Sequence, residues 1–150
     1  MMKRTLLKAL SMLLLIVVYG TFSFADSHGI IKYRQNVMKS AAGHMGAIVG
    51  ILKNRLPLEA HIVDHARSLI QISRMTLSIF PEGSGKGRTK SKQVIWEKWP
   101  EFESAASNFE RESLKLTEVA QSGDMEELSR QVRATGKTCS GCHRNFRKRN

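Results

Sequence analysis

Hydrophobic residues recur at intervals of three and four along most of the chain, which is the period of an amphipathic α-helix. The first such stretch ends near Asn54, because Pro57 disfavours helix at the residue before it. Its apolar positions are Ile31, Val37, Met38, Ala41, Ala42, Met45, Ile48, Val49 and Leu52. The second stretch ends before Pro81, with apolar positions at Ile62, Ala66, Leu69, Ile70, Ile72, Met75 and Ile79. The sustained alternation of a β-strand does not occur, so the pattern predicts helices.

Glycine and basic residues separate the two halves of this helical pattern. Residues 81–92 hold three glycines, four basic residues and no apolar residue beyond the proline, which predicts a solvated crossover loop. Residues 94–99 return to the core, and Pro100 suits the first turn of a third helix. Gly123 stops that helix, and Asp124 can cap a fourth one that continues to Phe146. Four helices with one long middle connection predict an all-α fold, an antiparallel four-helix bundle.

The N-terminus has the three parts of a secretory signal peptide. Residues 1–8 carry three basic residues and no acid, residues 9–19 are an apolar run, and residues 23–25 are Ser-Phe-Ala. The apolar run of 11 residues is shorter than the ~20 residues that cross a bilayer, which argues against the alternative of a membrane anchor. We therefore predict that residues 1–25 are cleaved on export and that residues 26–150 form one periplasmic bundle domain.

Basic residues outnumber acidic ones, with 24 Lys and Arg against 13 Asp and Glu and a formal net charge of +11. Such an excess first suggests nucleic acid as a partner. Removing the signal peptide lowers the charge to +8, and export argues against nucleic acid. Residues 128–150 hold seven Lys and Arg and no acid. We predict that this cluster steers redox partner proteins with acidic surfaces, with solubility and compensation of the helix dipole as the alternative.

The sequence Cys139-Ser-Gly-Cys142-His143 is the strongest chemical signal in the chain. This spacing is the attachment signature of a c-type haem. The two cysteine sulfurs would form thioethers with the two vinyl groups of one haem, and the adjacent histidine would be an axial ligand of the iron. A redox disulfide is one alternative, although such a motif normally opens a helix in a fold with strands. A zinc site is another, although it needs four ligands.

Several short segments resemble one known family and occur in the order of that family across nearly all of residues 26–150. The segments are residues 31–35 (IKYRQ), 43–46 (GHMG), 80–83 (FPEG), 95–97 (IWE), 120–124 (AQSGD), 136–143 (GKTCSGCH) and 146–147 (FR). On these residues the chain resembles the class II c-type cytochromes, the cytochrome c′ group. The resemblance implies one haem c inside the bundle, covalently attached to Cys139 and Cys142 near the end of the last helix.

The resemblance also implies roles for polar residues around the haem. His143 would be the proximal iron ligand, and Arg34 and Gln35 would lie near a haem propionate, since a guanidinium can pair with a carboxylate. The alternative for Arg34 is an ordinary solvated helix residue. Arg147 lies four residues after His143 and would tune or screen the proximal pocket. Members of the group often form homodimers through their first two helices, so a homodimer is one expected assembly.

The residue on the distal side of the haem decides which function the resemblance implies. In five-coordinate members a bulky apolar residue of the first helix blocks this side, whereas in low-spin members a methionine ligates the iron. The register of residues 33–35 places Met38 at this position, followed by Lys39 as in the Met-ligated branch. A thioether suits haem iron, and His/Met ligation raises the reduction potential. The alternatives for Met38 are core packing and its replacement as ligand by Met45.

We therefore predict a periplasmic mono-haem cytochrome that carries single electrons, with low-spin iron held by His143 and Met38. The alternative is a five-coordinate cytochrome c′ that binds or buffers nitric oxide or other small gases. The sequence offers no nucleophile–base pair, no paired-carboxylate site and no phosphate-binding loop, so an enzyme is not expected.

Three further histidines are weaker candidates for function. His61 and His65 are four residues apart on the second helix, a spacing that can bind a metal. Two histidines do not by themselves make a site, so we expect both at the surface. His44 lies between Gly43 and Gly46, which we interpret as a close helix contact rather than a haem contact.

Overall fold

The computed structural model describes residues 22–149, and side chains from residue 27 onward. Its helices are α2 (Phe22–Asn54), α3 (Glu59–Met75), α4 (Val94–Glu97), α5 (Trp99–Ser122) and α6 (Met125–Phe146). Within the described range the chain has no β-strand beyond an isolated bridge between Ser91 and Arg147. The expected signal peptide, residues 1–25, falls almost wholly outside that range and remains a prediction. None of the helices in the described part is long and apolar enough to cross a membrane.

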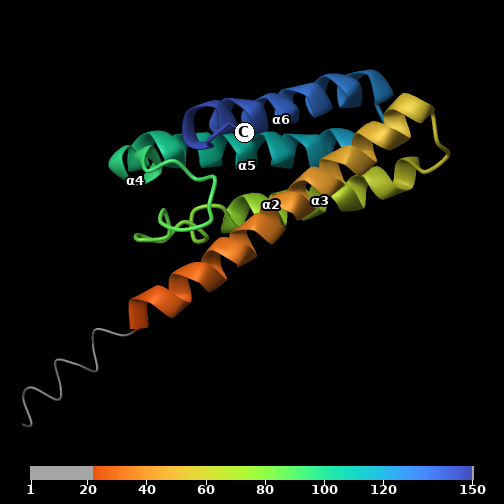
Figure 1. Cartoon of the computed structure of the whole chain (residues 1–150). Helices are drawn as coiled ribbons and strands as arrows, with labels where there is room; N and C mark the ends of the chain where they lie inside the picture. Colours follow the sequence, from red (N-terminus) through yellow and green to blue (C-terminus); the bar gives the residue numbers. More distant parts are fainter. Residues whose placement is uncertain (1–21, 150) are drawn as a thin grey trace, which may run out of the picture.

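The four long helices pack side by side, which confirms the predicted antiparallel four-helix bundle (Figure 1). Helix α2 packs on α3, α3 on α5, and α5 on α6. Short turns join α2 to α3 and α5 to α6, whereas a long connection joins α3 to the one-turn helix α4. Two details differ from the prediction. Helix α4 was not expected, and α3 ends at Met75 rather than near Ile79, because the Thr76 N–H turns back to the Ser73 carbonyl in a tighter turn.

Local sequence explains the ends of α5 and α6. Pro100 occupies the first turn of α5, where its missing N–H is not needed. Gly123 follows α5 with a φ of 75°, a left-handed conformation that glycine adopts without strain. The Asp124 carboxylate then accepts hydrogen bonds from the Glu126 and Glu127 N–H groups at 3.0 and 2.9 Å. The predicted helix stop and N-cap are therefore confirmed.

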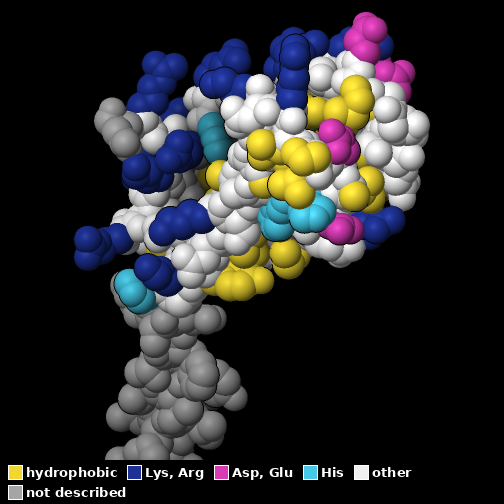
Figure 2. Space-filling model, turned by 90° about the vertical axis from the view of Figure 1, so that its right-hand side faces the viewer, with side chains coloured by type: hydrophobic (Ala, Val, Ile, Leu, Met, Phe, Trp, Pro, Cys, Tyr) yellow, Lys and Arg dark blue, Asp and Glu magenta, His cyan; other side chains and the backbone are white. Residues whose placement is uncertain are grey.

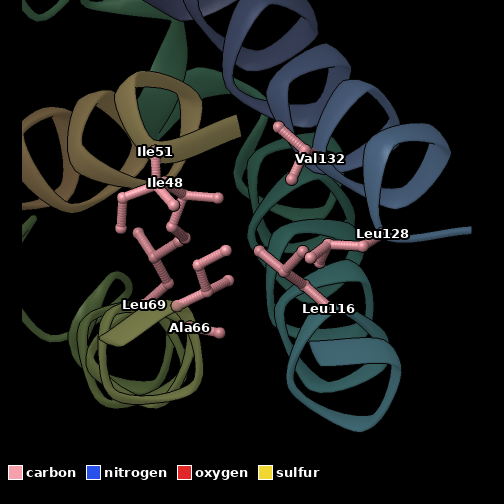
Figure 3. Close-up of a cluster of buried hydrophobic side chains, with 8 residues drawn as sticks. Ile48, Ile51, Ala66, Leu69, Leu116, Leu128 and Val132 are labelled. Atoms are coloured by element: carbon pink, nitrogen blue, oxygen red, sulfur yellow. The ribbon is translucent and has the colours of Figure 1, made fainter. Parts of the chain in front are cut away.

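Buried apolar side chains form two clusters along the bundle. The far cluster takes residues from all four long helices, namely Ile48, Ile51, Ile62, Ala66, Leu69, Leu116, Leu128 and Val132 (Figure 3). The near cluster, toward the α4 end, comprises Val37, Ile72, Ile79, Phe80, Ile95, Phe102 and Phe146. Its rings meet edge to face, with the Phe102 centroid 4.8 Å from Phe80 and 5.2 Å from Phe146. Burial of each large side chain stabilises the folded state by about 1.5–3 kcal/mol, so both clusters hold the helices together.

Most of residues 81–92, in the connection between α3 and α4, are exposed, as their composition predicts, but the connection also has a buried contact with α2. Ser84 in this connection is only 1% exposed, and Arg34 of α2 is 3% exposed. The Arg34 guanidinium donates to the carbonyl oxygens of Ile79 and Ser84 and to the Ser84 and Thr89 hydroxyl oxygens, at 2.9–3.2 Å. The composition did not predict that some polar groups of this exposed connection pair with one buried arginine. The connection is therefore anchored on α2.

Candidate haem site

A cavity of about 720 Å³ lies at the near-cluster end of the bundle, within the size range of ligand and cofactor sites. Its walls come from α2, α5, α6 and the connection that follows α3. All the residues that the sequence predicts for a haem site line this cavity, namely Arg34, Gln35, Met38, Cys139, Cys142, His143 and Arg147. The fold therefore brings together residues from the two ends of the described chain.

The C-terminal part of α6 carries the two cysteines and the adjacent histidine. Cys139 and Cys142 are partly buried and are not joined to each other. Burial raises the pKa of both thiols, and that of Cys142 reaches about 11. A redox disulfide motif needs a thiol with a lowered pKa, so this site does not fit that alternative. Partial burial, and then the nearby charge of Arg147, lower the pKa of His143 and so favour its neutral imidazole.

Helix α2 contributes a group of apolar side chains to the cavity wall, beside the polar Arg34, Gln35 and Lys39. Met38 is half-buried there and packs against the near cluster. Met45 lies two turns later on the same helix, lines the same cavity and packs against the far cluster. Ala41 and Ala42 lie between the two methionines and complete this wall. These four side chains carry two thioethers and no hydrogen-bond donor.

Arg34 is buried at the edge of the cavity, contrary to the alternative of a solvated helix residue. Its guanidinium lies 4.5 Å from the centroid of the Phe80 ring, a cation–π contact. Four of its five N–H groups make the hydrogen bonds to the connection, and the Nε–H has no partner among the described residues. No Asp or Glu in that part of the chain forms an ion pair with it. This buried cation therefore lacks a counter-charge among the described side chains.

Gln35 and Arg147, the other predicted polar residues, line the cavity and are fixed by hydrogen bonds to the backbone. Gln35 Nε2 donates to the Arg88 carbonyl at 2.9 Å, which ties α2 to the connection a second time. Arg147 caps the end of α6, and its N–H donates to the His143 carbonyl at 3.1 Å. Both side chains line the cavity, as the sequence predicts for residues near a haem.

Lys92 is a positioning residue that the sequence analysis missed. Its Nζ donates to the carbonyls of Arg144 and Asn145 at 3.1 and 2.9 Å, and its backbone N–H donates to the Phe146 carbonyl at 2.9 Å. These carbonyls belong to the last turn of α6, where a cation satisfies free acceptors and the helix dipole. The segment before α4 is thus tied to the helix end that carries His143. A lysine in a loop gives no sequence signal of such a contact.

The donor set and the shape of the cavity fit a covalently held haem. Two thiols and an imidazole lie within five consecutive residues of α6, and apolar side chains of α2 line the same cavity. A buried guanidinium, with no counter-charge among the described side chains, also lines it. A haem propionate is a carboxylate that could supply that charge. Within the described residues, Cys139, Cys142 and His143 do not form a group of three or more ligands that could hold a metal ion, so this motif does not fit the zinc alternative.

Comparison with known proteins agrees with this geometry. The family model described as Cytochrome C′ matches residues 29–147. The chain belongs to the cytochrome c′ family. Among its relatives is cytochrome c′ of Pararhodospirillum photometricum, 34% identical over 82% of this chain and 99% of the relative. The family and the four-helix fold predicted from the sequence are therefore confirmed, and the cofactor is covalently attached haem c.

Solved structures of the family have the same fold. Cytochrome c prime from Shewanella frigidimarina is 28% identical, with a TM-score of 0.77 over 82% of this chain and 97% of that one. A nitric oxide complex of a leucine-to-alanine mutant of cytochrome c prime from Alcaligenes xylosoxidans is 26% identical, with a TM-score of 0.76 over 83% and 97%. The Met-ligated branch remains a prediction for this chain.

Proposed function

We propose that this chain is a periplasmic mono-haem protein that takes up nitric oxide or another small gas at five-coordinate iron. The proposal is supported by one observation above all. A single cavity joins the wall that carries His143 to four side chains of α2 that carry no hydrogen-bond donor, namely Met38, Ala41, Ala42 and Met45. The likeness to a family member solved with nitric oxide supports the same choice. This reverses the order of preference that the sequence analysis gave to the two functions.

Each predicted residue has a defined task in this proposal. Cys139 and Cys142 hold the haem through thioethers, and His143 is the proximal ligand. When bound, haem iron supplies a position for a diatomic ligand and exchanges one electron. Arg34 pairs with a haem propionate through its remaining Nε–H, while its other N–H groups hold the connection between α3 and α4 against α2. The charge of Arg147 disfavours protonation of His143 and so keeps the imidazole lone pair available.

The apolar wall of α2 sets what can approach the distal side. Met38 and Met45 both line the cavity, and their thioether side chains are flexible and polarisable. None of these side chains can donate a hydrogen bond to a bound ligand, which favours nitric oxide over ligands that need such a donor. In this proposal Met38 covers the site without binding iron.

A single-electron carrier is the second candidate function. The observation that favours it is the half-buried thioether of Met38, which lines the same cavity as His143. Ligation by both residues would leave no open iron position and would hold the same ligands in both oxidation states. The two candidates therefore differ in what Met38 does.

Optical spectra of the purified haem protein in both oxidation states, before and after Met38→Leu, distinguish the two candidates. Leucine keeps the volume and apolarity of the side chain but cannot ligate iron. We expect a high-spin spectrum that the substitution does not change, and binding of nitric oxide to both proteins. Met45→Leu, on the same wall, is the matched control. A low-spin spectrum with a methionine-to-iron charge-transfer band that only Met38→Leu removes would establish the electron carrier instead.

The basic surface near the cavity supports electrostatic steering of acidic partners, whichever candidate holds. Figure 2 shows Lys and Arg gathered over one part of the visible face, apart from most of the acidic side chains. Arg144, Arg147, Lys148 and Arg149 are exposed at the end of α6. Arg130 does not belong to this surface, because its guanidinium pairs with Glu126 and Glu127 at 2.6 and 2.7 Å. We propose that the exposed group of four raises the rate of encounter with anionic partners.

Oxidation of the reduced protein by ferricyanide, an anionic probe, tests this steering. We expect the rate constant to fall several-fold between low and high salt, because salt screens the attraction. Arg144→Glu with Lys148→Glu should lower the low-salt rate, whereas Lys53→Glu at the end of α2 should change it much less. A rate that is independent of salt and of these substitutions would contradict the proposal.

A further inference from the structure

Two histidines from neighbouring helices meet between α2 and α3, outside the haem cavity. His44 of α2 and His65 of α3 place their Nδ1 atoms 3.0 Å apart, with ring centroids separated by 5.2 Å. Both residues are half-buried, and neither lines the cavity. Figure 2 shows histidine side chains gathered near the centre of one face, beside hydrophobic ones. The sequence analysis paired His65 with His61 along one helix and did not find this contact between helices.

The packing of α2 on α3 fixes the two rings in place. Ile48 lies one turn after His44, and Leu69 lies one turn after His65. Both are fully buried in the far cluster, where their side chains point toward one another (Figure 3). The two imidazoles therefore stand on adjacent, well-packed turns rather than on mobile loops. A ligand that binds both would need little ordering of the protein.

The separation of the two nitrogens matches chelation of one metal ion. Metal–nitrogen bonds of about 2.0–2.1 Å place two imidazole nitrogens about 2.9–3.4 Å apart, for angles between square-planar and tetrahedral. Without a metal, one Nδ1–H donates to the other Nδ1 across this distance. A shift of that proton to Nε2 of the same ring frees both Nδ1 lone pairs for a metal ion. Burial, and then the proximity of His65, lower the pKa of His44, which favours the neutral form that metals bind.

Both histidines of the pair are partly exposed. Gly43 and Gly46 flank His44, and a Cβ added at either glycine would meet nothing within 4 Å. This is not the close helix contact that the sequence analysis expected within the chain, because the two glycines face open space. Because both histidines are only half-buried, water can reach the pair.

We propose that His44 and His65 bind one divalent d-block cation per chain, Cu²⁺ or Zn²⁺, with water completing its coordination. Imidazole nitrogen suits both ions, and Cu²⁺ stands highest in the general order of affinity. The site has two protein ligands, because the described residues contain no group of three or more His, Cys, Asp or Glu. A bound ion links α2 to α3 at the side of the far cluster. The site is thus independent of the haem and of the function proposed for it.

Calorimetric titration of the untagged, haem-loaded protein with Zn²⁺ at neutral pH tests the site. We expect one ion per chain in the wild type and at least tenfold weaker binding in His44→Gln and in His65→Gln. Glutamine can still hydrogen-bond to the remaining imidazole, which favours a folded variant. His61→Gln is the matched control, because His61 is exposed on α3 one turn before His65, and its affinity should stay within twofold of the wild type. The Cu²⁺ form should show two nitrogen ligands by electron paramagnetic resonance.

Unfolding by urea with and without Zn²⁺ gives a second readout that does not depend on the pair variants. An ion that joins α2 to α3 in the folded state alone should raise the unfolding midpoint of the wild type and of His61→Gln, and a chelator should reverse the rise. The proposal is overturned by the absence of saturable binding, by equal affinity of wild type and pair variants, or by an equal loss in His61→Gln. One ion for every two chains would also overturn it.

Discussion

Replacing both cysteines, Cys139→Ser together with Cys142→Ser, is expected to abolish covalent attachment of haem completely. Each thiol attaches by adding across a vinyl double bond, with a new sulfur–carbon bond and the thiol proton moved to the neighbouring carbon. A serine hydroxyl does not make this bond under the same conditions. Haem staining after denaturing electrophoresis and the intact mass of the purified chain measure the result.

The single variants and a control sharpen this test. Cys139→Ser and Cys142→Ser should each retain at most one thioether, so haem bound by one bond is the expected product of each. Ser140→Ala lies inside the motif and is exposed, and it should leave attachment unchanged. Covalent haem that survives the double substitution would show that other residues hold the cofactor, and the assignment of Cys139 and Cys142 would be wrong.

Removing the buried guanidinium, by Arg34→Ala, is expected to lower the free energy of unfolding by about 3 kcal/mol or more. The substitution leaves the Ile79 and Ser84 carbonyls without this donor, and each buried polar group that loses its partner costs about 1–3 kcal/mol. It also removes the contact with the Phe80 ring. Urea unfolding of the haem-loaded protein, followed by helical circular dichroism, measures the loss.

Trypsin provides a local readout of the same substitution. The connection carries Lys86 and Arg88, and it is held down by Arg34, so cleavage after these residues should become much faster in Arg34→Ala. Arg34→Lys keeps the positive charge but lacks the planar guanidinium with its five N–H donors, so it should recover only part of the stability. Lys32→Ala, exposed on the same helix, should change the free energy of unfolding by less than about 0.5 kcal/mol. Wild-type stability and protease resistance in Arg34→Ala would show that the guanidinium does not anchor the connection.

Residues that act through local sequence were predictable, and residues that act across the fold were not. The helical period, the glycine stop at Gly123 and the cap at Asp124 follow from neighbours in sequence, and the structure has all three. The haem motif of α6 is equally local. Arg34 meets partners that are 45–55 residues away, and no spacing rule connects an arginine on one helix to a serine in a distant loop.

For the same reason, the sequence did not predict the contact between His44 and His65, nor helix α4. The contact between His44 and His65 depends on how α2 and α3 are rotated about their axes, whereas the pattern of one helix shows only its own faces. Helix α4 has four residues, too few for a period of 3.6 to be seen. The resemblance to a family predicted that Arg34 lies near the haem, and it did not predict the hydrogen bonds that hold this residue.

The two buried clusters have a consequence for how the protein matures. None of the eight buried side chains of the far cluster lines the haem cavity, whereas Phe80, Ile95, Phe102 and Phe146 of the near cluster do. We therefore expect the chain without haem to be folded unevenly, with a packed far half and a loosened half around the empty cavity. Such an intermediate would present the attachment motif on α6, whose N-terminal part is already packed in the stable far half. Insertion of the cofactor would then be the last step of folding rather than its nucleus.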